Sequence, residues 1–412
     1  MTDPAPRPGR SDVRRDFADP GRIFRAIRDA DAGIEPAADI AEFLYRNNCR
    51  RLLSNIDVPP ELEKRIRTDD IINRIAVGER FASCREVFRR FEESKIPFAV
   101  IKGAVLSQAA YGDPFTRRSG DIDILIGKDD APRVKEILLG CGFVQGKVED
   151  GALREFTRRE IIFQSAMTHQ LPPFTKKTRN PFCPFVQIDV NTDIFWGESE
   201  RECDMNAFLS DTVKCTVCGA ETRKLSPVGE FISMCLHHYK DANSLYLLSQ
   251  RPAPLSHFCD VLYYIRAGHL PLRPLTENAA GLGAASYVHY CLYYTYMIFG
   301  DSAVGRYLKA FDRIKGEDLT GYYGLTSAER RAWTVPLEER MTDRGFSKKF
   351  FASLSESEKE KVRTNLKYMY KKRAFVRAKA LFGINNTIAV PIKCGKSAKS
   401  DKKGGSIDPP LN

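Results

Sequence analysis

Apolar residues recur at the spacing of a helix through the first quarter of the chain. The repeat runs through DIAEFLYRNNCRRLLSNI (39–56) and again through DIINRIAVGERFASCREVFRRFEES (70–94). Residues 21–96 are therefore predicted to form an N-terminal helical region. Residues 1–20, which are polar and rich in proline, are expected to be a flexible leader.

Strands and helices alternate in the next part of the chain, which we predict to be a core at 97–224. Pro97 ends the helical repeat, and Phe98–Ile101 is a short apolar run typical of a buried strand. The other elements predicted here are strands in DIDILIG (121–127), EFTRREIIFQ (155–164) and FVQIDVNTDIF (185–195), and helices at 104–111 and 129–143. A basic, aromatic and proline-rich loop at 169–185 is expected to lie near the binding site.

The remainder of the chain is predicted to be helical from 225 to 383. Its helical repeats are 227–242, 257–270 and 285–300. These segments are rich in Tyr and Phe, and aromatic residues at helical spacing are typical of a packed core. The fold class expected from the whole pattern is α+β, with a short mixed sheet and its helices flanked by an N-terminal and a C-terminal helical region.

Composition narrows the class of protein. The longest apolar runs are far shorter than the roughly 20 residues that cross a bilayer, so we expect no membrane association. Eleven cysteines, an odd number without a regular framework, and a leader without an apolar segment favour reduced thiols in the cytoplasm. Cys215 and Cys218 have half the spacing of a zinc knuckle or a redox dithiol, but a hairpin turning near Gly219 explains them more simply.

The net charge of +11 favours anionic partners such as nucleotide phosphates or nucleic acid. Much of the excess lies in KEKVRTNLKYMYKKRAFVRAKA (359–380) and in the tail at 384–412, which we expect to be disordered. This basic C-terminal region either contacts nucleic acid or is a solvated helix followed by a tail.

Asp121 and Asp123 are the first candidates for chemistry. Strand side chains alternate, so Asp121-Ile122-Asp123-Ile124-Leu125-Ile126 places the isoleucines on one face and both carboxylates on the other, about 6.5–7 Å apart. Two like charges beside a buried run are costly unless a cation binds them. Mg²⁺ prefers hard oxygen ligands and substrate phosphates, so the pair would suit a site for a nucleoside triphosphate. The alternative is the start of a strand whose acidic residues face water.

Lys102 and Gly103 follow the first strand and precede a helix. Backbone N–H groups at a helix start can hold phosphate oxygens, and Gly103 would let them approach; the alternative is a tight turn that needs glycine for its backbone angle. Arg117 and Arg118 either bind phosphate or pair with Asp113 or the metal carboxylates.

Asp189 is a third acid in an apolar strand, VQIDV, where Ile188 and Val190 share the opposite face. Three inward carboxylates suit the two cations of nucleotidyl transfer, one at the attacking hydroxyl and one at the triphosphate.

Taken together, IKGAVL, YGDPFTRRSGDIDILI and QIDVN resemble the nucleotidyltransferase fold superfamily. Within it the chain most resembles the bacterial family of uncharacterised nucleotidyltransferases, over about 40–300. The resemblance implies a nucleotidyltransferase-fold core with Asp121, Asp123 and Asp189 as metal ligands and catalytic residues. Lys102 and Gly103 would form the phosphate-binding turn, with Arg118 beside it.

The chain departs from the family pattern at two positions. Ala104 stands where a serine commonly follows the glycine, and Asn191 stands where a histidine often follows the third aspartate. The family's helical part resembles 225–240 and the segment around Asp260; a histidine there, His237 or His238, either faces the cleft or belongs to the core.

The expected activity is transfer of a nucleoside monophosphate from a nucleoside triphosphate to a hydroxyl group, with Mg²⁺ or Mn²⁺ as cofactor and pyrophosphate as product. The acceptor would be a small molecule, a peptide or RNA. The alternative is a protein without catalytic activity that uses the same pocket to bind a nucleotide, or binds RNA through its basic C-terminal region.

Overall fold

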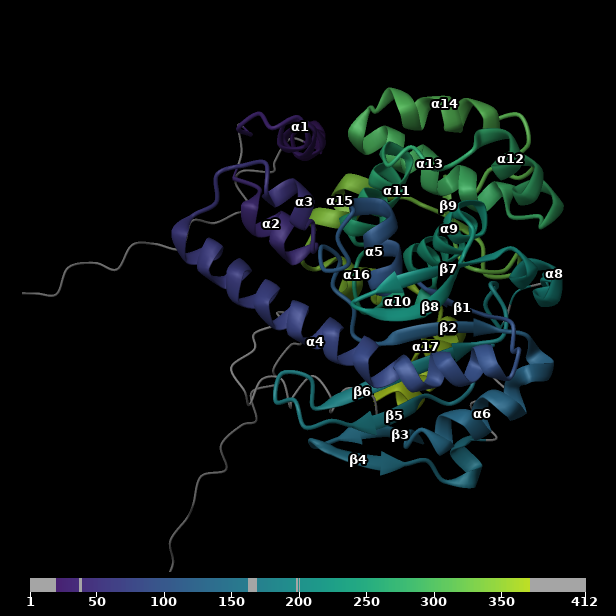
Figure 1. Ribbon diagram of the computed structural model, residues 1–412. Coiled ribbons are helices and arrows are strands. Elements are labelled where there is room, and N and C mark those ends of the chain that lie inside the picture. The colour runs from purple at the N-terminus through teal and green to yellow at the C-terminus, as the bar shows by residue number, and fades with distance from the viewer. Residues whose placement is uncertain (1–19, 37–38, 162–168, 198, 200, 371–412) are drawn as a thin grey trace, which may run out of the picture.

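The computed structural model describes residues 20–36, 39–161, 169–197, 199 and 201–370 (Figure 1). The predicted leader, apart from Pro20, and the predicted tail at 384–412 lie outside these residues. The last part of the predicted C-terminal helical region, 371–383, lies outside them as well.

Helices begin and end the described chain, and the strands lie between them. The helices are α1 (Pro20–Asp31), α2 (Ala41–Arg46), α3 (Arg50–Leu53), α4 (Pro60–Glu93), α5 (Gly103–Tyr111), η1 (Lys128–Asp130), α6 (Ala131–Gly140), α8 (Met205–Ser210), α9 (Pro227–Asn243), α10 (Leu245–Leu248), α11 (Leu255–Arg266), α12 (Leu272–Gly281), α13 (Ala285–Phe299), α14 (Ser302–Phe311), α15 (Leu337–Thr342), α16 (Phe346–Ser353) and α17 (Glu356–Tyr370). The strands are β1 (Phe98–Ile101), β2 (Ile122–Ile126), β3 (Val144–Glu149), β4 (Ala152–Glu155), β5 (Phe174–Lys177), β6 (Phe185–Asn191), β7 (Thr212–Val217), β8 (Ala220–Leu225), β9 (Tyr322–Tyr323) and β10 (Arg331–Ala332). No helix of this part of the chain is long and apolar enough to cross a membrane.

The main sheet has six strands in the order β1-β2-β6-β5-β3-β4. β2 and β6 run parallel, whereas the other neighbouring pairs are antiparallel. Parallel neighbours cannot be joined by a tight hairpin, and here the connection from β2 to β6 contains the three strands at the far edge of the sheet. The predicted α+β class with a mixed sheet is confirmed.

The two faces of β2 differ as the sequence predicts. Ile122, Ile124 and Ile126 belong to a buried apolar cluster with residues of α4 and α6, which cover this face of the sheet (Figure 1). Leu125 lies on the opposite face, in a smaller cluster with residues of α8 and β8. Asp123 shares the face of Leu125 because strand side chains alternate.

The N-terminal and C-terminal helices share one hydrophobic core. Ile27 of α1 and Leu52 of α3 belong to the same buried cluster as Phe231 of α9 and Tyr290 of α13. The predicted role of the aromatic residues as core is confirmed, since Phe231, Tyr239 and Tyr290 are all at most 1% exposed. The boundaries proposed above, 21–96, 97–224 and 225–383, therefore separate sequence segments that are in contact in the folded chain.

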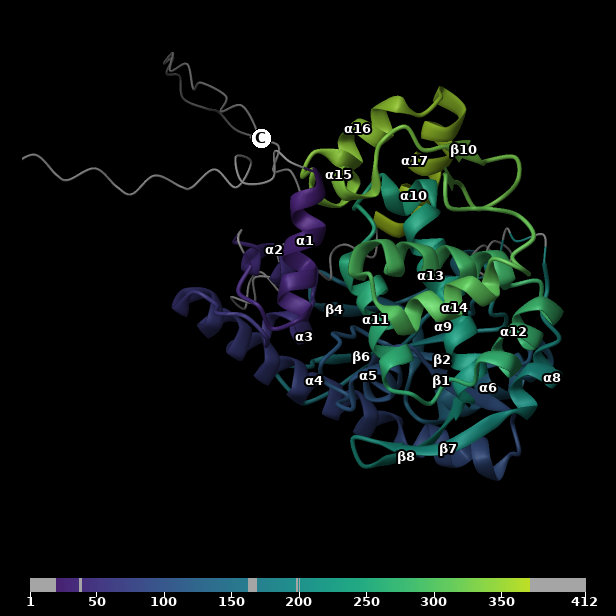
Figure 2. The same ribbon diagram turned by 90° about the horizontal axis from the view of Figure 1, so that it is seen from above.

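The last described helices pack at one end of this helical layer. Figure 2 shows α16 and α17 beside α10, and side chains of these three helices form a separate apolar cluster. α15 also contacts α1, where the Glu338 carboxylate accepts a 3.2 Å hydrogen bond from the Ile23 backbone N–H. This contact satisfies a donor in the first turn of α1.

The strand predicted at 155–164 is wrong over 156–161, and its last residues, 162–164, lie outside those that the structure describes. β4 ends at Glu155, and residues 158–161 are helical. Thr157 and Glu160 form a capping box, in which the Thr157 hydroxyl accepts from the Glu160 N–H and the Glu160 carboxylate accepts from the Thr157 N–H. The Thr-x-x-Glu spacing starts a helix here and overrides the apolar residues that follow.

Two further local features differ from the sequence pattern. The loop expected at 169–185 contains β5, which pairs with β6 and β3. The single repeat at 39–56 is divided into α2 and α3 by a turn in which Asn48 has φ of 57°. Asparagine tolerates this left-handed conformation better than most residues.

The hairpin predicted around Cys215 and Cys218 is confirmed. β7 and β8 are antiparallel, and the turn between them has Cys218 at φ 51° and Gly219 at φ 72°. Two consecutive positive φ angles are typical of the tightest hairpin turns.

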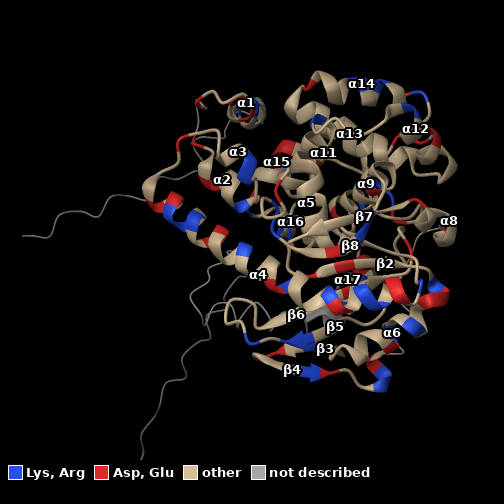
Figure 3. Cartoon of the chain, viewed as in Figure 1, with Lys and Arg blue, Asp and Glu red and all other residues tan. Residues whose placement is uncertain are grey.

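Charged residues of both signs are interspersed over the helices (Figure 3). The described basic residues of α17 illustrate this, because Lys359 pairs with Glu356, Lys361 with Glu329, and Arg363 with Glu360. Much of the charge on this part of the predicted basic region is therefore neutralised locally.

Phe98 tests the packing between β1 and α4. Its side chain is fully buried, and its ring centroid lies 6.1 Å from that of Phe88 and 5.2 Å from that of Phe91. Phe98→Ala is expected to lower the free energy of unfolding by about 3–5 kcal/mol, measured by urea denaturation, because it leaves a cavity. Phe182→Ala is the control, since Phe182 is 48% exposed; equal losses in the two variants would contradict this packing.

Candidate active site

The site begins at the turn between β1 and α5. Lys102 has φ of 60° and ψ of −152°, and Gly103, with φ of 46°, begins α5. A Cβ on Gly103 would lie 2.9 Å from Ser119 Oγ, which donates a 2.7 Å hydrogen bond to the Asp121 carbonyl oxygen. Glycine is therefore favoured at 103 both by its backbone angle and by the close approach of the segment that leads into β2.

Lys102 and Asp123 form an ion pair in this turn. Nζ lies 3.0 Å from Oδ1, and the two side chains are only 14% and 13% exposed. Burial by itself would lower the pKa of the Lys102 amine, but the carboxylates of Asp123 and, more weakly, Asp121 raise it above its ordinary value. Lys102 is therefore charged at neutral pH, and its charge neutralises part of the acidic site.

Asp123 and Asp189 are direct neighbours in the parallel pairing of β2 and β6. Asp189 Oδ1 accepts a 2.7 Å hydrogen bond from the Gln187 amide, and Asp123 Oδ1 accepts one of 3.3 Å from the Asn191 amide. Asn191 is itself held by Gln170, whose amide donates to Asn191 Oδ1 at 2.6 Å. The residue that departs from the family pattern is thus part of the hydrogen bonding around the carboxylates.

A cavity of about 440 Å³ opens beside these carboxylates. All six site residues predicted from sequence line it: Lys102, Gly103, Arg118, Asp121, Asp123 and Asp189. The opposite walls come from α3, α9 and α11, far away in the sequence. The volume is in the range of sites for small molecules and cofactors, about 300–1,000 Å³.

The arginines before β2 pair with acids on other elements. Arg118 forms a close ion pair with Asp69 of α4, and Arg117 Nε lies 2.9 Å from Asp260 Oδ2 of α11. Asp113, a partner considered from sequence, pairs with Arg74 at 3.6 Å instead. Both arginines still line the cavity.

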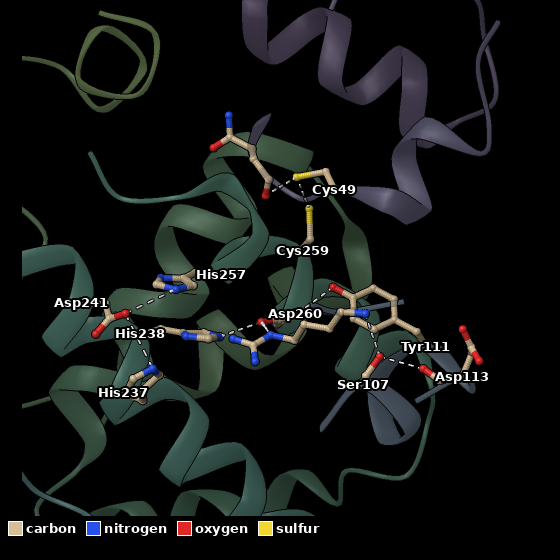
Figure 4. Close-up of polar contacts among 12 residues, drawn as sticks. Cys49, Ser107, Tyr111, Asp113, His237, His238, Asp241, His257, Cys259 and Asp260 are labelled. Atoms are coloured by element: carbon tan, nitrogen blue, oxygen red, sulfur yellow. Dashed lines mark hydrogen bonds and ion pairs between the residues drawn. The ribbon is translucent and has the colours of Figure 1, made fainter. Parts of the chain in front are cut away.

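Asp260 lies at the centre of a buried polar network (Figure 4). Besides Arg117, the Tyr111 hydroxyl donates to Asp260 Oδ1 at 2.8 Å, and His238 Nε2 lies 3.2 Å from Oδ2. Burial would raise the pKa of the Asp260 carboxyl, but the Arg117 guanidinium and His238 hold it below its usual value. Asp260 is thus an anion that joins α11 to α5 and to the segment before β2.

Ser107 of α5 holds the other end of that segment (Figure 4). Its hydroxyl donates a 2.7 Å hydrogen bond to the Asp113 carbonyl oxygen and accepts one of 2.9 Å from the Arg117 N–H. The arginines and carboxylates that follow are therefore carried by a loop that is anchored at both ends.

Three histidines gather near Asp241 and Asp260 (Figure 4). His237 and His257 line it, and their Nε2 atoms lie 3.7 and 3.9 Å from Asp241 Oδ2. The ring of His257 stacks on that of buried His238, with centroids 4.1 Å apart. Burial lowers the pKa of all three imidazoles. Both possibilities raised from sequence therefore apply: His237 faces the cavity, and His238 belongs to the core.

The oxygen donors of the cavity suit a hard divalent cation, since carboxylates are the ligands that Mg²⁺ and Mn²⁺ prefer. Within the residues that the structure describes, no group of three or more His, Cys, Asp or Glu side chains is already arranged to hold a metal. Instead, the Asp123 carboxylate pairs with the Lys102 ammonium, and the Asp189 carboxylate accepts a hydrogen bond from the Gln187 amide. A cation would have to compete with these contacts.

Sequence comparison identifies the family. Residues 37–300 match the model of a family described as uncharacterised nucleotidyltransferase. The chain belongs to this family. The resemblance that the motifs indicated is confirmed over nearly the range expected from them. The matched residues include β2 with Asp123, β6 with Asp189, and Asp121, which directly precedes β2 instead of lying on it.

Comparisons with curated proteins and with solved structures give no further information on function. A search of curated proteins gave no match. Among solved structures, the chain is similar to the crystal structure of an antigenic nucleotidyltransferase-like protein from Paracoccidioides brasiliensis, with 15% identity over 56% of this chain and 93% of that chain, at a TM-score of 0.34.

Some residues of the cavity were not predicted from sequence, namely Arg50, Lys240, Asp241, Arg251 and His257. For Arg50 a signal was available: it stands three residues before buried Leu53, so the helical repeat places a charge on the apolar side. Such a charge needs a partner or a ligand.

Gly103 tests the close approach between the Lys102 turn and Ser119. Gly103→Ala is expected to lower the free energy of unfolding by about 1–2 kcal/mol, because alanine is strained at this positive φ and its Cβ presses on Ser119 Oγ. Gly120→Ala is the matched control, since a Cβ there meets nothing within 4 Å. Chemical denaturation of both variants checks this; a smaller loss at 103 than at 120 would disprove the constraint.

The pH dependence of stability tests whether burial keeps the His257 imidazole neutral in the folded protein. The pKa of this imidazole lies well below the ordinary 6.5, so the unfolded chain takes up a proton that the folded chain does not, and stability falls as pH drops below about 6.5. His257→Gln is expected to reduce the slope of unfolding free energy between pH 6.5 and 5 by up to about 1.4 kcal/mol per pH unit. His269→Gln, at an exposed histidine, is the control. An unchanged slope in His257→Gln would show that this imidazole titrates in the folded state.

Proposed function

We propose that this protein transfers a nucleoside monophosphate from a nucleoside triphosphate to a hydroxyl group, with Mg²⁺ or Mn²⁺ as cofactor. The bond between the α- and β-phosphates breaks, the acceptor oxygen bonds to the α-phosphorus, and pyrophosphate leaves. The observation that supports this most strongly is the convergence of Asp121, Asp123, Asp189 and Lys102 on one cavity in a member of the nucleotidyltransferase family.

The turn at Lys102 and Gly103 is suited to the triphosphate. α5 begins at Gly103, so the first N–H groups of the helix are available to phosphate oxygens, and Ala104 leaves this contact to the backbone. The Lys102 ammonium, which now pairs with Asp123, can turn to a phosphate when one arrives, since both partners are anionic oxygens.

The three carboxylates would bind the cation and activate the acceptor. Asp121 and Asp123 would hold the cation, together with Asp189, and the cation would neutralise charge that develops on the phosphates. Asp189 would orient the acceptor hydroxyl and take its proton, and its position beside Asp123 in the register of the two strands supports this role. The acceptor, whether small molecule, peptide or RNA, would enter from the side of the cavity formed by α3 and α11.

The second candidate function is nucleotide or RNA binding without transfer. The ion pair between Lys102 and Asp123 favours it, because a carboxylate that is already neutralised binds a cation more weakly. In this case the protein would bind a triphosphate through Lys102 and Gly103 but release no pyrophosphate. RNA bound through the basic C-terminal region would in addition show a steep dependence on salt.

The activity is tested by release of pyrophosphate from each of the four common nucleoside triphosphates, with Mg²⁺ or Mn²⁺ and a cell extract as the source of acceptor. Asp121→Asn/Asp123→Asn is expected to lower the rate at least about hundredfold, equivalent to about 2.7 kcal/mol in the transition state. The cause would be loss of two carboxylates that hold the cation.

Asp129→Asn/Asp211→Asn removes the same charge from exposed positions and is the matched control. It is expected to keep the wild-type rate. If the folded wild type releases pyrophosphate from none of the nucleotides with either metal, while still binding one of them, the second candidate function replaces the first.

A further inference from the structure

Arg50 is an unusual feature of the cavity wall. It begins α3, it lines the cavity, and its side chain is only 8% exposed. Its Nε, Nη1 and Nη2 atoms are buried, and none of them has a hydrogen-bond partner of good geometry among the described residues. A guanidinium presents five N–H donors, and leaving them unsatisfied in a buried place is costly.

The acids near Arg50 compensate its charge incompletely. Its Nε lies 3.0 Å from Asp70 Oδ1, but its Nη2 is 3.6 Å from Asp69 Oδ2. That oxygen of Asp69 also accepts a 2.6 Å hydrogen bond from the Tyr45 hydroxyl and pairs closely with Arg118. This one carboxylate oxygen is thus approached by the Tyr45 hydroxyl and by two guanidinium groups.

Further positive charge lies along the same part of the cavity. Arg51 and Arg118 line it together with Arg50, and Arg118 stands three residues before Asp121. Asp69 pairs with both Arg50 and Arg118, and Arg118 is close in sequence to Asp121. The arginines therefore lie on the side of the cavity that carries the candidate metal ligands. The Arg50 and Arg118 guanidinium groups, which meet at Asp69, are suited to the several oxygens of a phosphoryl group.

We propose that Arg50, Arg51 and Arg118 form an anion subsite that binds a phosphoryl group beside the three aspartates. As a substrate subsite it rests on the proposed function, in which the phosphoryl group belongs either to the triphosphate of the donor or to a phosphorylated acceptor. An anion here would supply the acceptor oxygens that the Arg50 guanidinium lacks. It would also offset the burial that lowers the pKa of Arg50.

The test uses the full chain and inorganic phosphate as the probe, with binding measured by isothermal titration calorimetry. Arg50→Gln/Asp70→Asn removes both members of the ion pair, so that the Asp70 carboxylate is not left without its cationic partner. This variant is expected to bind phosphate about ten- to hundredfold more weakly, the usual effect of losing charge-assisted hydrogen bonds. Arg50→Lys keeps the charge without the planar fork and is expected to show a smaller loss.

Two single variants sharpen the comparison. Asp70→Asn removes a carboxylate that competes for Arg50, so it is expected to bind phosphate at least as tightly as the wild type. Arg273→Gln removes an arginine whose side chain is 88% exposed, and it is expected to leave the affinity unchanged. A folded Arg50→Gln/Asp70→Asn protein that binds phosphate within twofold of wild type would overturn the subsite. Should that variant not fold, unchanged affinity in Arg50→Lys would overturn it.

Saturating tripolyphosphate distinguishes the two sources of the phosphoryl group. If it prevents phosphate binding, the subsite belongs to the triphosphate of the donor; if phosphate still binds, the subsite belongs to the acceptor. Asp121→Asn/Asp123→Asn separates this proposal from the proposed function. Phosphate binding that depends on Arg50 in this variant supports the subsite even when no nucleotide is turned over.

Discussion

The parallel pairing of β2 with β6 is the constraint on which the site depends. It places Asp123 directly beside Asp189, and strands in a sheet lie only about 4.8 Å apart. Two carboxylates at this spacing repel each other unless positive charge is near. The Lys102 ammonium supplies it on one side, and the Gln187 and Asn191 amides donate to the carboxylates.

The turn that carries Lys102 has an unusual backbone conformation. Lys102 has a positive φ, a conformation that costs on the order of 1–3 kcal/mol in a residue with a side chain. The ion pair with Asp123 and the close packing of Gly103 on Ser119 hold the turn in place. The same turn begins α5, so one local structure provides both a positive charge and a helix start, the two features that the proposed triphosphate would need.

The rest of the cavity is assembled across the fold. The buried network of Arg117, Asp260, Tyr111 and His238 joins the loop before β2 to α5, α9 and α11, and the core shared by α1, α3, α9 and α13 brings Arg50 to the same place. Ionic contacts of this kind hold the walls at fixed positions, because breaking a buried pair leaves a charge without a partner. The helical regions therefore form part of the site as well as flanking the sheet.

The α+β class, the turn at Lys102 and Gly103, and the faces of the strands that carry Asp123 and Asp189 could all be predicted from the sequence. Alternation and apolar runs encode which side of an element is buried. The sequence by itself did not determine the partners. Residue periodicity says nothing of which elements meet, so the pairing of Lys102 with Asp123, the place of Arg50 in the wall and the missed strand β5 depended on contacts between distant segments. These features depend on the folded chain, because strand pairing and the packing of distant helices bring such residues together.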